Sequence, residues 1–234
     1  MRGVRRVCAV LLACAATAAG QYEEPADAAP PEWRYLWGGA AFRTFEPRAS
    51  NTAPADARIS YDQVMGTLGF RQGPADLSVG YTSFTQAGES HESIIVNLLY
   101  SFPFPLTGQG PTVLVLPVMV GADYTKAEAA GPEKNTFNVG SIGIGTGLEV
   151  RHRSPGTELS VSAGALAHYS TEAYNFTGGF SAAVVGEAVL LFPRIGILDG
   201  LAVGYRVRYQ TWSMSNEFFN YETFAHGPFV GIML

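Results

Sequence analysis

The sequence predicts an all-β protein, a closed antiparallel up-and-down transmembrane β-barrel of ten strands, with eight or twelve strands as the alternative counts. Three observations lead to this fold class. The 234-residue chain is 47% hydrophobic and only 15% charged, yet it has no run of about 18–20 apolar residues such as a spanning helix needs. Stretches in which apolar and polar residues alternate recur along the chain, as expected for strands with two unlike faces. The connections between these stretches alternate between two kinds.

Residues 1–20, MRGVRRVCAVLLACAATAAG, have the pattern of a secretory signal peptide. Arginines at positions 2, 5 and 6 precede an apolar stretch that runs to about residue 16, and small residues follow. Cleavage after Gly20 would leave a mature chain without cysteine, which excludes a disulfide framework. The alternative is a lipoprotein signal, because the segment LLAC would place a lipid anchor on Cys14.

Residues 21–31, QYEEPADAAPP, show no periodicity and are rich in Pro, Ala and Glu, so they predict a disordered periplasmic tail. The predicted barrel then occupies residues 32–234. Removing the signal, with its three arginines and no acidic residue, takes the formal net charge from −5 to −8. Because the mature chain is acidic and has no Lys/Arg cluster, nucleic acid is excluded as a partner.

Ten alternating stretches are expected to be strands, and the first five lie within residues 33–124. Their ranges are 33–45, 59–71, 76–85, 92–103 and 112–124. The second of these is the least regular. The apolar sides of the other four carry, in chain order, Trp33, Tyr35, Trp37 and Ala41; Leu77, Val79 and Tyr81; Ile94, Val96, Leu98, Tyr100 and Phe102; Leu114, Leu116, Val118, Val120 and Tyr124. The opposite sides carry Ser78, Gly80 and Thr82 in the third stretch and Ser93, Asn97 and Ser101 in the fourth.

The remaining five expected strands span 137–151, 158–170, 179–192, 200–212 and 222–234. Their apolar sides carry Ile142, Ile144, Leu148 and Val150; Leu159, Val161, Ala163, Ala165 and Tyr169; Phe180, Ala182, Val184, Ala188, Leu190 and Phe192; Leu201, Val203, Tyr205, Val207 and Tyr209; Phe224, Val230, Ile232 and Leu234. In GLAVGYRVRYQTW, residues 200–212, Arg206 and Arg208 lie on the other side. An even number of strands places both chain ends at the same end of the barrel.

The connections supply an independent pattern. Those after the second, fourth, sixth and eighth strands are compact and rich in Pro and Gly: RQGPAD, PFPLTGQGP, RHRSPGT and PRIGILDG. Those after the odd strands are polar and mostly longer: EPRASNTAPADAR, TQAGESHE, TKAEAAGPEKNT, STEAYNFTG and SMSNEFFNYE. Short turns at one end and longer loops at the other are typical of outer-membrane barrels, with the turns in the periplasm.

Aromatic residues cluster near the ends of the expected strands, where barrels carry interfacial girdles. The examples are Trp33, Tyr35 and Trp37 in the first strand, and Tyr100, Phe102, Tyr124, Tyr169, Phe180, Phe192 and Phe224 in later ones. Aromatic residues also favour strands in general, so this placement is the weakest of the signals.

The polar sides decide between a membrane barrel and a soluble β protein. A soluble sandwich would carry Lys, Glu and Arg on its wet face, whereas these polar sides carry mostly Gly, Ser, Ala and Thr. Small uncharged residues suit a narrow lumen, and closure satisfies every backbone hydrogen bond within lipid. The sequence therefore favours apolar sides that face hydrocarbon.

With its signal, its connection pattern and its apolar end PFVGIML, the chain resembles the small outer-membrane β-barrel proteins of diderm bacteria over residues 32–234. The resemblance implies location in the cell outer membrane, contact with outer-membrane lipids and lipopolysaccharide, and insertion by the barrel-assembly machinery. This chain ends in Leu234, where the family usually has an aromatic residue. Pro117 and Pro228 lie inside expected strands, so we expect bulges or local breaks there.

Charged residues on the polar sides are expected to point into the lumen, where they must be paired. The candidates are Glu149, Glu187, Arg206 and Arg208. Since Glu187 and the two arginines lie on neighbouring strands, we expect Glu187 to pair with Arg206 or Arg208. The pair can be a structural plug, which we favour, or a gate or selectivity element of a narrow pore.

Two enzymatic interpretations rest on short matches. In AHYSTE, His168 and Ser170 precede Glu172, which resembles the His-x-Ser pair and separate glutamate of outer-membrane lipid A deacylases, although Thr171 replaces the usual Asn. An omptin-like protease would suit ten strands but needs paired acids and a His–Asp pair above the rim. Its nearby candidates are Asp123, Glu89, His91 and Glu92.

The sequence predicts no metal site and no cofactor. The four histidines, His91, His152, His168 and His226, lie on separate elements without ligand spacing. The glycines of GSIGIGTG, residues 140–147, alternate along a strand and are expected to be spacers in the lumen instead of a phosphate loop.

The function we expect from the sequence is structural or interactive, without catalysis, through polar extracellular loops such as YTKAEAAGPEKNT and WSMSNEFFNYETF. The first rival is a narrow channel for small solutes, and the second is a barrel-borne hydrolase. The sequence leaves the oligomeric state open.

Overall fold

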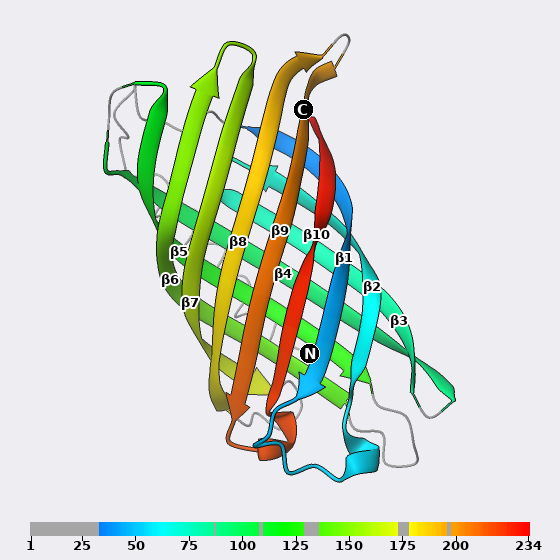
Figure 1. Cartoon of the computed structure of the whole chain (residues 1–234). Helices are drawn as coiled ribbons and strands as arrows, with labels where there is room; N and C mark the ends of the chain where they lie inside the picture. The colour runs from blue at the N-terminus through cyan, green and yellow to red at the C-terminus, as the bar shows by residue number, and fades with distance from the viewer. Residues whose placement is uncertain (1–32, 87, 108–109, 129–135, 173–177, 196–197) are drawn as a thin grey trace, which may run out of the picture. The chain divides into compact units, whose positions relative to one another are not determined.

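The computed structural model describes residues 33–86, 88–107, 110–128, 136–172, 178–195 and 198–234. The predicted signal and tail lie outside these residues. The described chain forms ten strands and two 3₁₀ turns (Figure 1). The strands are β1 (Arg34–Pro47), β2 (Tyr61–Gln72), β3 (Ala75–Gln86), β4 (Glu89–Pro105), β5 (Thr112–Glu128), β6 (Thr136–Ser154), β7 (Thr157–Glu172), β8 (Gly178–Ile195), β9 (Leu198–Met214) and β10 (Tyr221–Met233), and the turns are η1 (Ala55–Ala57) and η2 (Glu217–Phe219).

The strands close into a barrel in which each pairs antiparallel with its neighbours in sequence, and β1 pairs with β10. This confirms the predicted up-and-down topology and the ten predicted strands. The connections that follow odd strands lie at the lower end of the barrel in Figure 1, which we call the loop end, and the turns that follow even strands lie at the upper end, the turn end. No helix in the described ranges is long and apolar enough to cross a membrane.

The outer face of the barrel is apolar, as predicted. Val203 and Tyr205 on β9 are 40% and 43% exposed, whereas Ala202 and Gln210, on the opposite side of the same strand, are buried. On β6 the same alternation leaves Ile144 69% exposed. A closed barrel with an apolar belt of this kind satisfies its backbone groups internally and presents side chains suited to hydrocarbon. The fold and its outer face are therefore those of an outer-membrane β-barrel.

The first strand departs from the predicted girdle. Tyr35 and Trp37 are 0% and 4% exposed and point into the barrel, and the outward residues of β1 include Leu36 and Phe42. The prediction was wrong here because both sides of β1 are apolar, so alternation does not indicate which side meets lipid. Exposed aromatic residues do lie near the loop end of other strands: Tyr81, Tyr169, Phe180, Tyr209 and Phe224.

The two predicted strand prolines interrupt pairing without changing register. Between β1 and β10 the pairing passes from Gly39–Phe229 to Phe42–His226, and so omits Pro228. Between β5 and β6 it passes from Val115–Glu149 to Val118–Thr146, and so omits Pro117. Each proline lacks an N–H, which explains a local break of this size.

The glycines of β6 allow close approach to β7. A Cβ atom at Gly145 would lie 2.0 Å from the carbonyl oxygen of Ala165, and one at Gly143 would lie 2.4 Å from that of Ala167. By contrast, nothing lies within 4 Å of the Cβ position at Gly140, at the loop end of the same strand. The inward glycines are thus required by strand packing.

Candidate functional site

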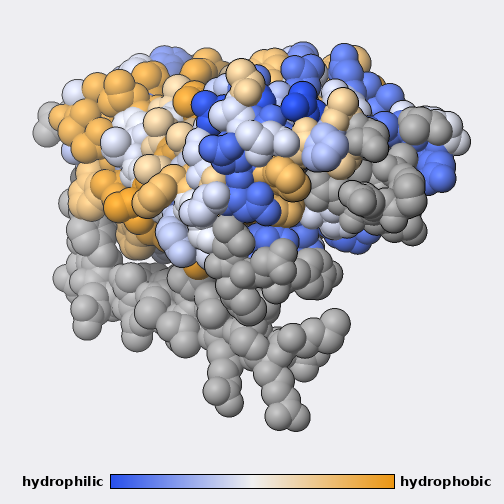
Figure 2. All heavy atoms as spheres, turned by 90° about the horizontal axis from the view of Figure 1, so that it is seen from below, coloured by the Kyte–Doolittle hydropathy of each residue, from blue (hydrophilic) through white to orange (hydrophobic). Residues whose placement is uncertain are grey.

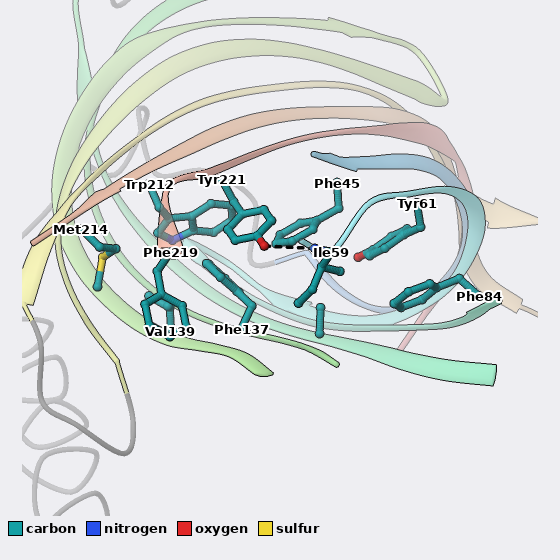
Figure 3. Close-up of a cluster of buried hydrophobic side chains, with 11 residues drawn as sticks. Phe45, Ile59, Tyr61, Phe84, Phe137, Val139, Trp212, Met214, Phe219 and Tyr221 are labelled. Atoms are coloured by element: carbon teal, nitrogen blue, oxygen red, sulfur yellow. Dashed lines mark hydrogen bonds between the residues drawn. The ribbon is translucent and has the colours of Figure 1, made fainter. Parts of the chain in front are cut away.

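The loop end of the lumen is filled by one cluster of buried side chains, which we call the aromatic plug (Figure 3). Its members are Phe45, Ile59, Tyr61, Phe84, Ala127, Phe137, Val139, Trp212, Met214, Phe219 and Tyr221. Each is at most 6% exposed. The plug draws on seven of the strands, and so it ties opposite walls of the barrel together.

Ring contacts run through the plug from one wall to the other. Phe84 of β3 stacks on Tyr61 of β2 with centroids 4.4 Å apart, and Phe45 of β1 stacks on Tyr221 of β10 at 4.8 Å. Tyr61 and Phe45 are themselves stacked at 5.5 Å. Phe137, from β6 across the barrel, meets Tyr221 edge-on at 5.1 Å. These ring contacts therefore span the interior from one wall of the barrel to the other at the loop end.

A buried arginine lies directly against the plug. Arg43 is 1% exposed, and its guanidinium carbon lies 5.4 Å from the centroid of the Phe45 ring. Its Nε donates to Thr223 Oγ1 at 2.9 Å, and its Nη1 donates to Ser93 Oγ on β4 at 3.4 Å. The Tyr61 hydroxyl donates to the same Ser93 oxygen at 2.8 Å. Polar contacts therefore join β1, β2, β4 and β10 in this layer.

The middle of the lumen holds four charged residues, Arg71, Asp76, Glu187 and Arg206, which we call the ion cluster. Arg206 of β9 donates through Nε to Glu187 Oε2 and through Nη2 to Asp76 Oδ2, both at 2.5 Å. Arg71 of β2 pairs with the other oxygen of Glu187. Since β2 and β3 lie across the ring from β8 and β9, these pairs span the lumen.

Aromatic rings support the ion cluster from the turn end. The Arg206 guanidinium carbon lies 4.0 Å from the Trp37 ring centroid and 4.7 Å from that of Phe229. Both rings belong to a second apolar cluster, formed by Tyr35, Trp37, Val189, Leu191, Ala202, Phe229 and Met233. Arg206 is therefore held by two carboxylates and two aromatic faces at once.

Of the two arginines expected as partners of Glu187, Arg206 pairs with it, and Arg208 pairs with another residue. Its Nη2 lies 3.2 Å from Asp123 Oδ2 on β5 and donates to Gln210 Oε1 at 2.8 Å. Gln210 Nε2 in turn donates to Asp123 Oδ1 at 3.0 Å. Glu187 thus pairs with Arg206 and with Arg71, and Arg208 makes a second contact across the lumen.

Glu149 is buried on β6 and binds a residue of its own strand. Its two carboxylate oxygens accept from Arg151 Nε at 2.7 Å and Nη2 at 2.9 Å. Ser160 of β7 donates a third hydrogen bond at 2.7 Å. Glu149 is therefore not brought together with the other three predicted residues.

The residues proposed for a lipid A deacylase lie inside the barrel. His168 and Ser170 are 2% and 0% exposed, and Ser170 Oγ donates to Ser141 Oγ at 2.9 Å. His168 Nε2 lies 3.5 Å from Asp123 Oδ2, in the arrangement that holds Arg208. A lipid on the outer face of the barrel cannot reach these groups without a rearrangement of the wall.

The residues proposed for an omptin-like site do not converge either. His91 is buried against the Phe84 ring, with centroids 5.5 Å apart, whereas Glu89 and Glu92 are exposed. Asp123 contacts His168 and not His91. Within the described ranges, no three His, Cys, Asp or Glu side chains gather as a metal-ligand set.

The buried side-chain amides of two asparagines hold the loops at the loop end in place. Asn51 Nδ2 donates to the carbonyl oxygens of Phe218 and Asn220 at 3.0 and 3.1 Å, which ties the β1–β2 loop to the β9–β10 loop. Asn220 Oδ1 accepts from the backbone N–H of Met214 at 2.7 Å. We call residues 48–60 and 215–220 the loop platform. Its outer surface includes Phe218, which is 41% exposed.

Comparison with known proteins assigns no family and no role to this chain. No family model and no curated protein matches this chain. Among solved structures, it is similar to Neisserial surface protein A (11% identity, 86% of this chain and 97% of that chain, TM-score 0.34) and to the beta domain of the Bordetella autotransporter BrkA (10%, 86% and 100%, 0.36). It is also similar to the outer membrane protease OmpT from Escherichia coli (7%, 86% and 94%, 0.36). These similarities are too distant to assign a role.

Proposed function

We propose that this chain is a non-conducting outer-membrane barrel that acts structurally and presents its extracellular loops to partners. The proposal rests on the side chains that occupy the lumen. The aromatic plug closes the loop end, and beyond it Arg71–Glu187, Asp76–Arg206 and Asp123–Arg208 cross the interior. A diffusing solute would have to break several of these contacts.

The loop platform supports the interactive part of the proposal. Its buried amides fix two loops against each other before any partner binds, so little ordering entropy is lost on association. Phe218 offers an exposed aromatic surface of the kind enriched in interfaces.

Planar-bilayer recording of the refolded full chain tests the closed lumen. We expect no discrete conductance steps from the wild type, with a porin refolded in the same way as the positive control. Discrete steps that change in an Arg206→Ala variant would instead establish the narrow channel and overturn this proposal.

The proposal assigns no catalysis to the barrel. Ser170 is enclosed and bonded to Ser141, so Ser170→Ala should leave the lipid A of expressing cells unchanged. Mass spectrometry of lipid A provides the measurement. Loss of an acyl chain on expression of the wild type, abolished in Ser170→Ala, would establish the hydrolase instead.

A further inference from the structure

Strands β2 and β3 stop pairing with each other before they reach the loop end. Pairing between these strands runs from Gln72–Ala75 only as far as Gly66–Tyr81. On their other sides both strands stay paired to the loop end, β2 with β1 as far as Tyr61 and β3 with β4 as far as Gln86. Figure 1 shows the two strands diverging below this point. We call the residues that face each other here, 61–65 and 82–86, the β2–β3 notch.

The backbone edges of the notch are turned toward each other. The Val64 carbonyl accepts from Thr82 Oγ1 at 2.9 Å, so the backbone groups of Val64, and by alternation those of Asp62, point toward β3. Continuing the register of the paired residues places Ser83 opposite Val64 and Thr85 opposite Asp62. Gln63, which alternation places on the inner side between buried Tyr61 and Met65, is exposed. This exposure fits the end of strand pairing at this position.

The notch is closed from the inside. The stacked rings of Tyr61 and Phe84 lie behind it, and Gln86 Nε2 donates across its outer end to the Arg58 carbonyl at 2.6 Å. A ligand in the notch would therefore lie in the wall and would not enter the lumen. Because Tyr81 marks its inner limit and belongs to the exposed aromatic residues near the loop end, the notch opens on the solvent side of the apolar belt.

The surroundings of the notch are acidic. Glu46, Asp62, Glu89 and Glu92 are exposed on β1, β2 and β4, while the guanidinium of nearby Arg58 is bonded to the Ala53 and Asn51 carbonyls. In Figure 2, which views the molecule from below, hydrophilic residues gather on the right, the side on which β3 lies in Figure 1.

We propose that the β2–β3 notch binds an extended basic peptide segment, which adds as a strand to the free edge of β3. Beyond Tyr81, β3 has no strand partner on the β2 side, although the Ser83 carbonyl accepts from Thr82 Oγ1 at 3.4 Å. A strand edge without a partner is the template for β-strand addition. The acidic side chains on both sides favour lysine or arginine at the outward positions of the added strand. This inference rests on the proposed interactive function and names the chemistry of its partner.

Binding of a synthetic peptide with alternating lysine and valine to the full chain in lipid nanodiscs tests the proposal. Isothermal titration calorimetry should detect binding. The same peptide with methylated backbone nitrogens keeps the charge but cannot donate to the strand edge, so we expect its affinity to be at least about tenfold lower. Equal binding of both peptides, or no binding of the parent peptide, would overturn strand addition.

Two matched substitutions locate the site. Thr85→Pro removes an N–H that faces the notch, and we expect about fivefold weaker peptide binding, whereas Thr85→Val keeps the N–H and should bind as the wild type does. Heat-modifiable gel migration verifies that both variants fold. Full affinity in folded Thr85→Pro would overturn the assigned edge. The proposed closed lumen is tested separately: conductance steps in the planar bilayer would overturn it, whether or not the peptide binds.

Discussion

Arg206 is the residue on which the middle of the lumen most depends. It bridges Glu187 and Asp76 and stacks on Trp37 and Phe229, while its side chain is only 23% exposed. Breaking a buried ion pair from one side costs about 3–5 kcal/mol, because the remaining charge stays buried without its partner. Glu187 keeps its contact with Arg71, so we expect Arg206→Met to lower the free energy of unfolding by about 3 kcal/mol, the lower end of this range.

The assay is equilibrium unfolding in urea of the barrel refolded into lipid vesicles, followed by tryptophan fluorescence. Arg206→Lys keeps the charge but loses the forked geometry and the ring stacking, so it should cost about 2 kcal/mol. Lys126→Met is the control, because Lys126 also pairs with a glutamate, Glu128, but both side chains of this pair are substantially exposed, at 33% and 44%. Its loss should cost less than about 1 kcal/mol.

A double-mutant cycle tests the reasoning directly. Asp76→Asn combined with Arg206→Met should show a coupling energy of about 1–3 kcal/mol, because the two side chains are in contact. If Arg206→Met costs no more than Lys126→Met, or if the cycle shows no coupling, then the ion cluster does not stabilise the barrel.

Three further substitutions test the plug, the strand packing and the outer face. Phe137→Ala should lower the free energy of unfolding by about 3–5 kcal/mol in the same urea assay, since the ring is fully buried among other rings; a loss below about 1 kcal/mol would show that the plug collapses around the gap. Gly145→Ala should abolish the heat-modifiable folded band on a gel, whereas Gly140→Ala should keep it, and the reverse pattern would contradict the close packing of β6 on β7. Ile144→Arg should cost about 2–4 kcal/mol in vesicles, because this 69% exposed side chain lies in the predicted lipid-facing belt, and an unchanged stability would place it in water.

The architecture could be predicted because alternation and connection length are local properties. On β9 one side is apolar and the other carries Arg206 and Arg208, so the orientation of the strand follows from the chemistry of its two sides. On β1 this argument gave the wrong face for Tyr35 and Trp37. The lumen itself is apolar at both ends, and an aromatic residue suits such a lumen as well as it suits lipid.

The ion pairs also differ in whether the sequence could predict them. Glu187 and Arg206 lie opposite each other on the adjacent strands β8 and β9, and adjacency can be read from the sequence. Asp76 and Asp123 reach β9 across the lumen, and that contact depends on the width of the barrel, which the sequence does not specify. A signal for the plug was present, however, in aromatic residues such as Phe84 that occupy the polar side of the alternation near the loop end.

Direct contacts join the aromatic plug to the loop platform. Phe219 of η2 belongs to the plug, and the Tyr221 hydroxyl, which accepts from the Ile59 N–H at 3.1 Å, joins the plug to the β1–β2 loop (Figure 3). The buried rings of the plug therefore also hold the β1–β2 and β9–β10 loops in place. Under the proposed function, loops that are already held by this packing would lose little ordering entropy when a partner binds them.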